Sequence, residues 1–131
     1  MLAPISKPVK VNVSRSVAEV VERRVMVCTA YTAGFESTGK VPSDSDYGQV
    51  AISTPNNPVY AKEWYTIAAP PSIPIGTKIY IPYFVDKPNR GVFVVEDRGG
   101  QIKGDRLDVF MEKREDALEF GKRDLEVWVR Y

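Results

Sequence analysis

Residues 97–108 read Asp-Arg-Gly-Gly-Gln-Ile-Lys-Gly-Asp-Arg-Leu-Asp, and an apolar stretch, Val92–Val95, comes just before them. We predict that one strand ends at Asp97, that the glycines form an open turn, and that a second strand starts at Leu107. Because strand side chains alternate between two faces, a buried Leu107 leaves Asp108 on the opposite face. Glycine has no side chain, so a ligand can approach the backbone of this turn closely.

Asp97 and Asp108 are therefore expected at the rims of neighbouring strands, on either side of the glycine turn. In a shared cleft, one carboxylate raises the pKa of the other, which prepares an acid that can protonate a leaving group near neutral pH. An equally supported alternative makes Asp97 and Asp105 ordinary turn residues and pairs Asp108 with Arg106 or Lys103. The segment is not a phosphate-binding loop, because it lacks the Gly-Lys-Ser/Thr ending and no helix follows it directly.

The residue types that are missing narrow the chemistry further. The chain has 131 residues, the size of a single domain, and it contains no histidine. Histidine-based triads, zinc sites and general bases are thereby excluded, and the single cysteine, Cys28, excludes an internal disulfide. A net charge of +1 gives no support to nucleic-acid binding. We expect no metal and no cofactor, so carboxylates, lysines, tyrosines or hydroxyls must carry any reaction.

The remaining segments indicate a mainly β fold. Residues 1–15 suggest an extended arm or an edge strand, and residues 16–28 suit either a short helix that feeds a strand or one long strand. Eight prolines between Pro42 and Pro88 exclude a long helix there. Further strands are predicted at Tyr65–Ala68, Thr77–Tyr83, Gly91–Glu96, Leu107–Met111 and Leu125–Tyr131, with one helix at Glu112–Phe120. Many short strands with one late helix favour a small β-barrel.

A second polar segment follows the predicted strand around Cys28. Residues 29–40 read Thr-Ala-Tyr-Thr-Ala-Gly-Phe-Glu-Ser-Thr-Gly-Lys, which combines hydroxyls, aromatic rings, a carboxylate and an amine. Sugar-binding sites use this mixture, because aromatic faces pack on the ring while polar groups bind its substituents. Without further information an ordinary solvated loop is the favoured explanation, and Ser37–Gly48 is predicted to be a surface loop.

Three motifs in a fixed order make the chain resemble a known family. They are Thr29–Gly34 with Glu36–Lys40, then Ile73–Ile81, then Glu96–Asp108. Together they resemble the 3D domain, named for three aspartates and found in stationary-phase survival proteins and in the lytic transglycosylase A family. The resemblance covers about Val25–Tyr131. It implies a six-stranded double-psi β-barrel with one or two short helices at 25–131, preceded by an N-terminal arm at 1–24.

The resemblance also implies a site on peptidoglycan glycan strands. Asp108 matches the catalytic acid/base, and Asp97 lies beside it. Further substrate contacts are expected from Lys40, Glu36, Thr32, Gly99, Gly100 and Lys103. One family aspartate is replaced by Ala69 in this chain, so its carboxylate is not available to tune the acid or to hold a sugar.

The function expected on this basis is that of a lytic transglycosylase that leaves 1,6-anhydro-MurNAc ends. Two alternatives remain open, a two-carboxylate glycoside hydrolase on the same barrel and a non-catalytic peptidoglycan-binding or phage-tail module. The expected place of action is the cell wall, although residues 1–7 show no signal peptide. No stretch is long and apolar enough for a membrane span, and the N-terminal arm offers a route to oligomers.

Overall fold

The computed structural model describes residues 8–13, 17–99 and 102–131, and this part of the chain is mainly β. Its strands are β1 (Pro8–Val13), β2 (Val17–Tyr31), β3 (Thr66–Ala68), β4 (Lys78–Tyr80), β5 (Val92–Asp97), β6 (Arg106–Phe110) and β7 (Arg123–Arg130). Two α-helices, α1 (Phe35–Thr38) and α2 (Arg114–Phe120), and one 3-10 turn, η1 (Pro82–Phe84), accompany them. The predicted strands and the late helix are therefore confirmed, with shifts of a few residues at their ends.

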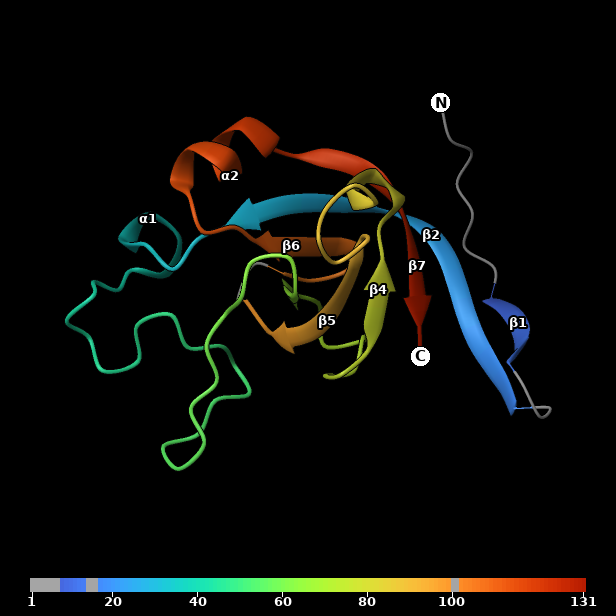
Figure 1. Cartoon of the computed structure of the whole chain (residues 1–131), viewed down its shortest axis with the longest axis horizontal. Coiled ribbons are helices and arrows are strands. Elements are labelled where there is room, and N and C mark those ends of the chain that lie inside the picture. Colours follow the sequence, from blue (N-terminus) through green and yellow to red (C-terminus); the bar gives the residue numbers. More distant parts are fainter. Residues whose placement is uncertain (1–7, 14–16, 100–101) are drawn as a thin grey trace.

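Six of these strands close into a ring. They follow the order β2-β6-β3-β5-β4-β7, and β7 pairs back onto β2 (Figure 1). The pairs β2–β6 and β3–β5 are parallel, whereas the other pairs of the ring are antiparallel. The mainly β, six-stranded ring with two short helices agrees with the barrel that the resemblance implies.

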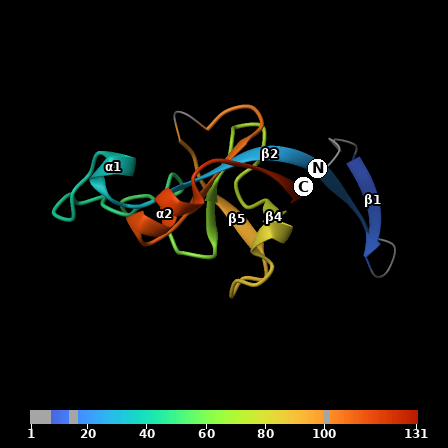
Figure 2. The ribbon, with the colours of Figure 1, turned by 90° about the horizontal axis from the view of Figure 1, so that it is seen from above.

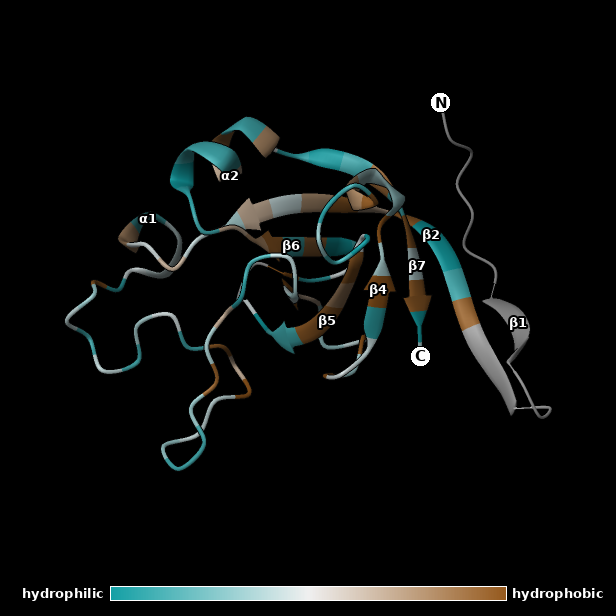
Figure 3. Ribbon diagram, viewed as in Figure 1, coloured by the Kyte–Doolittle hydropathy of each residue, from teal (hydrophilic) through white to brown (hydrophobic). Residues whose placement is uncertain are grey.

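The hydrophobic core fills the inside of the ring. Successive strand residues point to opposite faces, so each strand contributes every second side chain, such as Ile67, Leu107 and Val129, all fully buried. Figure 3 shows the hydrophobic segments along the strands of the ring, while α2 is mostly hydrophilic. The outer faces of β2, β6, β3 and β5 remain available for polar side chains.

A hairpin extends from one end of the ring. β1 pairs with the first part of β2 in an antiparallel register from Pro8↔Glu22 to Val13↔Val17 (Figures 1 and 2). The edge strand predicted within residues 1–15 is thus confirmed for β1. From Val17 onward the helical alternative is wrong, because β2 continues as one strand to Tyr31. β-branched valines favour this outcome, since their side chains lose freedom in a helix.

Two loops frame the outer face that carries the polar residues. One runs from α1 to β3 and makes exposed turns with few regular pairs, such as the bridge Gln49↔Tyr60. The other is the glycine turn between β5 and β6. None of the helices in the described ranges is long and apolar enough to cross a membrane.

Candidate active site

Asp97 and Asp108 stand at the same level of the ring, one strand apart. Ala68 of β3 pairs with Asp97 of β5 on one side and with Asp108 of β6 on the other. The sequence predicted that the strands carrying these two aspartates are neighbours, and this prediction is wrong, because β3 lies between β5 and β6. Two strand spacings of about 4.8 Å put their backbones roughly 10 Å apart, with the small Ala68 between them.

An irregularity in β5 turns Asp97 toward the outer face. The register of the β3–β5 pair shifts between Ile67, which faces Val95, and Ala68, which faces Asp97. Strict alternation would put Asp97 on the same inward face as the fully buried Val95. The additional residue, Glu96, reverses this parity in the manner of a β-bulge, a feature that often re-aims side chains next to active sites.

Three hydrogen bonds hold the Asp97 carboxylate. The Tyr31 hydroxyl donates to Oδ2 at 2.8 Å, and the backbone N–H groups of Ala51 and Arg98 donate to Oδ1 at 2.8 and 2.9 Å. Ala51 belongs to the loop between α1 and β3, so Asp97 ties this loop to the ring. A carboxylate with three donors around it acts as a fixed hydrogen-bond acceptor.

Asp108 has a different environment. Burial raises the pKa of its carboxyl group to about 6, the hydrogen bond from Thr29 and the charge of Arg106 oppose this rise, and the charge of Asp97 adds a smaller increase. The Thr29 hydroxyl donates to Oδ1 of Asp108 at 3.0 Å, and Nη2 of Arg106 reaches that hydroxyl at 3.4 Å. Among the described residues no donor reaches Oδ2, so this oxygen is left for a ligand.

Both aspartates line one open cavity of about 430 Å³, called here the aspartate groove. Its walls are formed by Tyr31, Ser37, Thr38, Lys40, Asp46, Gln49, Val50, Ala51, Ser53, Ala68, Asp97, Arg98, Gly99, Ile102 and Asp108. The groove thus brings together four of the side chains and backbone segments that the sequence singled out, namely Asp97, Asp108, Lys40 and Gly99.

Lys40 and Gly99 both line the aspartate groove. Lys40 forms an ion pair with Asp46, and this contact lowers the pKa of the Asp46 carboxyl group. Gly99 lies under Ile102, since a Cβ atom added at Gly99 would come within 2.9 Å of Cγ1 of Ile102. Only glycine therefore fits at position 99 without a shift of the turn.

The other expected substrate contacts lie elsewhere. Thr32 and Glu36 line a neighbouring cavity, and the Thr32 hydroxyl lies 3.3 Å from Oε2 of Glu36. Lys103 is exposed on the glycine turn and is absent from the lining of the aspartate groove. Gly100 falls outside the described residues.

The structure gives specific partners to Thr29 and Tyr31, which the sequence placed only within the mixed polar segment 29–40. Both project from β2 on the face opposite the fully buried Cys28. The alternation of side chains along this strand was the available signal, but their partners lie 66 and 79 residues away in the chain. Among the side chains that the structure describes, at 21–99 and 102–131, no group of three or more His, Cys, Asp or Glu residues could hold a metal ion.

Ala69, which replaces an expected aspartate, belongs to the hydrophobic core. It is fully buried and does not line the aspartate groove, whereas the preceding Ala68 does. Nη1 of Arg98 donates to the carbonyl oxygens of Ala69 and Pro70 at 3.0 and 2.9 Å. A side chain at position 69 thus starts behind the groove rather than inside it.

Comparisons with known proteins agree with this architecture. The model of a family described as the 3D domain matches residues 65–130, half of the chain. The Cell wall-binding protein YocH of Bacillus subtilis (strain 168) is 30% identical over 85% of this chain and 33% of its own length. From the same organism, "Putative cell wall shaping protein YabE" is 29% identical over 90% of this chain and 25% of its own length.

A third relative from Bacillus subtilis (strain 168) carries a phage-related name. The SPbeta prophage-derived uncharacterized protein YorM is 29% identical over 84% of this chain and 43% of its own length. The chain therefore spans between a quarter and less than half of the length of these three relatives.

Proposed function

This chain belongs to the 3D domain family, and on that premise we propose that it binds peptidoglycan glycan strands and cleaves them as a lytic transglycosylase. The names of its relatives support a role at the cell wall, since one is called a cell wall-binding protein and another a cell wall shaping protein. The aspartate groove, which holds both acidic side chains, supports the cleavage.

One observation carries the catalytic part of the proposal. Asp108 is a partly buried carboxyl group in a sugar-sized groove, and burial raises its pKa to about 6. A general acid must hold its proton near the working pH and release it to the leaving group, which an ordinary carboxyl group does poorly at that pH. The unpaired Oδ2 of Asp108 gives this proton an outlet toward the substrate.

The reaction then proceeds in two proton transfers. Protonated Asp108 donates to the bridging oxygen while the bond between C1 of MurNAc and that oxygen breaks, so GlcNAc leaves with a hydroxyl group. The Asp108 carboxylate next takes the proton of the C6 hydroxyl of MurNAc, whose oxygen forms the new bond to C1. Asp108 ends as it began, no water is consumed, and a 1,6-anhydro ring is formed.

Asp97 supports this sequence without exchanging a proton. Its carboxylate is fixed by three donors, and it faces the groove at the level of Asp108. Positive charge develops on the sugar ring when the glycosidic bond breaks, and a preorganised negative charge stabilises that state. Lys40 and the backbone at Gly99, which also line the groove, would hold the glycan.

Product analysis of digested peptidoglycan tests the proposal. We expect the wild-type chain to release 1,6-anhydro-muropeptides and Asp108→Asn to release them at least 100-fold more slowly, because the acid is lost. Asp105→Asn is the matched control, since Asp105 lies on the same turn but is exposed and pairs with Arg24. Products with reducing ends would show hydrolysis instead, and unchanged release by Asp108→Asn would exclude Asp108 as the acid.

A non-catalytic wall-binding module is the second candidate. The name of YocH states binding, and Ala69 stands where the family has an aspartate. This candidate predicts that the chain sediments with insoluble peptidoglycan while no soluble product appears at any pH from 4 to 8. Both measurements use the same digest, so one experiment separates the two candidates.

A further inference from the structure

A second cavity lies next to the aspartate groove, and we propose that it binds the peptide stem of the glycan strand. This inference rests on the proposed binding of peptidoglycan. The cavity, called here the side cavity, measures about 700 Å³ and is lined by residues that include Glu36, Lys62, Glu63, Phe110, Glu112 and Arg114. Its volume lies within the range of sites that hold small organic ligands.

One wall separates the side cavity from the aspartate groove. Tyr31 lines the groove and Phe110 lines the side cavity, and their rings meet edge to face with centroids 5.4 Å apart. The two cavities also meet at α1, where Glu36 lines the side cavity and the next residue, Ser37, lines the aspartate groove. A ligand that fills the groove and carries a branch can therefore place that branch in the side cavity.

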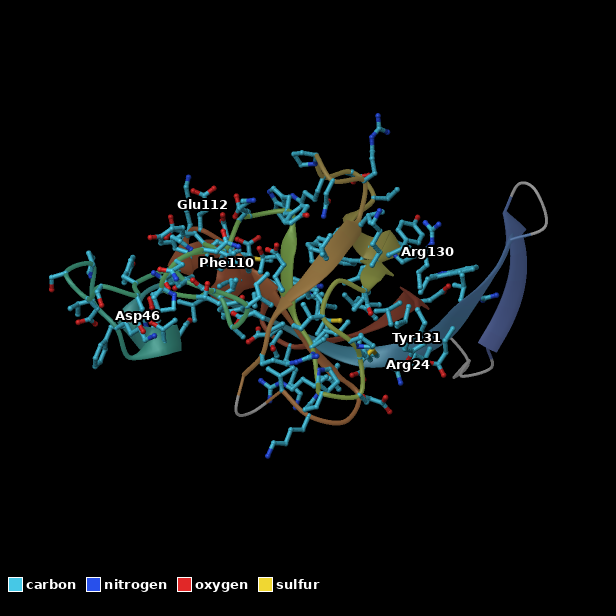
Figure 4. The ribbon with its side chains drawn as sticks, turned by 90° about the horizontal axis from the view of Figure 1, so that it is seen from below. Arg24, Asp46, Phe110, Glu112, Arg130 and Tyr131 are labelled. Atoms are coloured by element: carbon cyan, nitrogen blue, oxygen red, sulfur yellow. The ribbon has the colours of Figure 1, made fainter. Side chains whose placement is uncertain are left out.

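The charges of the side cavity match a zwitterionic branch. Among the described residues, the Arg114 guanidinium and the Glu112 carboxylate take part in no hydrogen bond or ion pair, so both are available to a ligand. Lys62 lies over the ring of Tyr65, with Nζ 5.2 Å from the ring centroid. Figure 4 shows Phe110 and Glu112 on the same half of the molecule as Asp46, far from Arg24 and Tyr131.

Glu63 fixes the rim of this cavity. Its Oε2 accepts a hydrogen bond of 2.9 Å from the backbone N–H of Glu112, which joins the segment before β3 to the segment before α2. The side chains of Glu112 and Arg114 thus project from a backbone that this hydrogen bond holds in place. A preorganised site of this kind loses less conformational entropy when a ligand binds.

Peptidoglycan chemistry identifies the branch. The sugars of the glycan backbone are mostly uncharged, whereas the peptide stem carries carboxylates and, on its diamino acid, a free amino group. The stem is attached to the muramic acid ring, the same ring that the aspartate groove would hold for cleavage. Arg114 and Lys62 suit the carboxylates, and Glu112 suits the amino group.

Binding of two soluble probes tests the inference. Calorimetry would compare a stem-bearing disaccharide-tetrapeptide with the same disaccharide lacking the peptide. We expect the double variant Glu112→Gln/Arg114→Gln to weaken binding of the stem-bearing probe about tenfold and to leave binding of the bare disaccharide unchanged. Lys113→Gln/Glu115→Gln is the matched control, because these exposed neighbours do not line the side cavity.

Each outcome is decisive. Equal weakening for both probes would assign the side cavity to sugar, and no weakening, or no binding of the stem-bearing probe by the wild type, would overturn the inference. The assay needs no cleavage, so a stem-dependent loss would uphold the side cavity even if Asp108→Asn and the wild type released identical products. Conversely, the loss of cleavage in Asp108→Asn with no stem preference would uphold the proposed function alone.

Discussion

The Tyr31 hydroxyl donates a hydrogen bond of 2.8 Å to Oδ2 of Asp97, although the two residues project from β2 and β5, with β6 and β3 between these strands. Both residues line the aspartate groove, so this bond connects two lining residues whose strands are not neighbours in the ring. Burial, and then the charge and hydrogen bond of Asp97, raise the pKa of the Tyr31 hydroxyl far above its ordinary value. Tyr31 therefore remains a donor over the whole working range of pH.

Removing this donor should slow cleavage more than it weakens binding. We expect Tyr31→Phe to lower kcat about tenfold with KM changed by less than twofold, because Asp97 loses the contact that fixes Oδ2, and to cost about 1 kcal/mol of stability. Initial rates of anhydro-product release give both constants. Tyr83→Phe is the control, since Tyr83 is exposed and lies away from the groove. A rise in KM alone would contradict a positioning role for Tyr31.

The pH dependence of cleavage should follow Asp108. Its acid form is lost as pH rises through about 6, so kcat/KM should fall above that pH. The hydrogen bond from Thr29 lowers the pKa of Asp108, and its removal in Thr29→Val should move this descending limb to higher pH. Rates measured from pH 4 to 8 on both proteins check the prediction. A limb that stays in place in Thr29→Val would show that another group titrates.

The raised pKa of Asp108 also means that this residue lowers the stability of the folded chain at neutral pH. The folded chain holds the Asp108 proton up to about pH 6, whereas an unfolded aspartate releases it near 3.8. The free energy of unfolding therefore falls as pH rises from about 4 to 6. Asp108→Asn should be about 1–3 kcal/mol more stable than the wild type at pH 7 and no more stable at pH 3. Urea unfolding at both pH values measures this difference, and an equal gain at both would exclude the titration as its cause.

The turn between β5 and β6 shows what the sequence could predict about the site. Alternation around a buried Leu107 was sufficient to place Asp108 on the outer face, because β6 is regular. The same rule fails for Asp97, since a register shift beside Glu96 reverses its direction. Local spacing carries no information on β3, whose Ala68 lies between the two acidic strands although it precedes Asp97 by 29 residues and Asp108 by 40 residues in the chain. Long-range pairing of this kind is decided by the closure of the ring.

We expect a negative charge at position 69, where the family pattern has an aspartate, to lower the stability of this chain. Ala69 is fully buried in the hydrophobic core, and Arg98 is already engaged with two carbonyl oxygens. We expect Ala69→Asp to lower stability by about 1–3 kcal/mol at pH 7 without raising the cleavage rate. Ala69→Asn separates size from charge, because only the aspartate variant should regain stability as the pH is lowered to 3. A faster enzyme with unchanged stability would contradict this placement.

Close packing in the glycine turn yields a prediction that does not depend on the substrate. A Cβ atom at position 99 would lie 2.9 Å from Cγ1 of Ile102, so Gly99→Ala should displace the turn and cost about 1–3 kcal/mol of stability. Ile102→Ala removes the opposing atom, at its own cost for a buried side chain. In the double variant the added methyl group should then cost less than about 0.5 kcal/mol. Thermal or urea unfolding of the four proteins completes the cycle, and additive costs would show that Gly99 is needed for a reason other than its contact with Ile102.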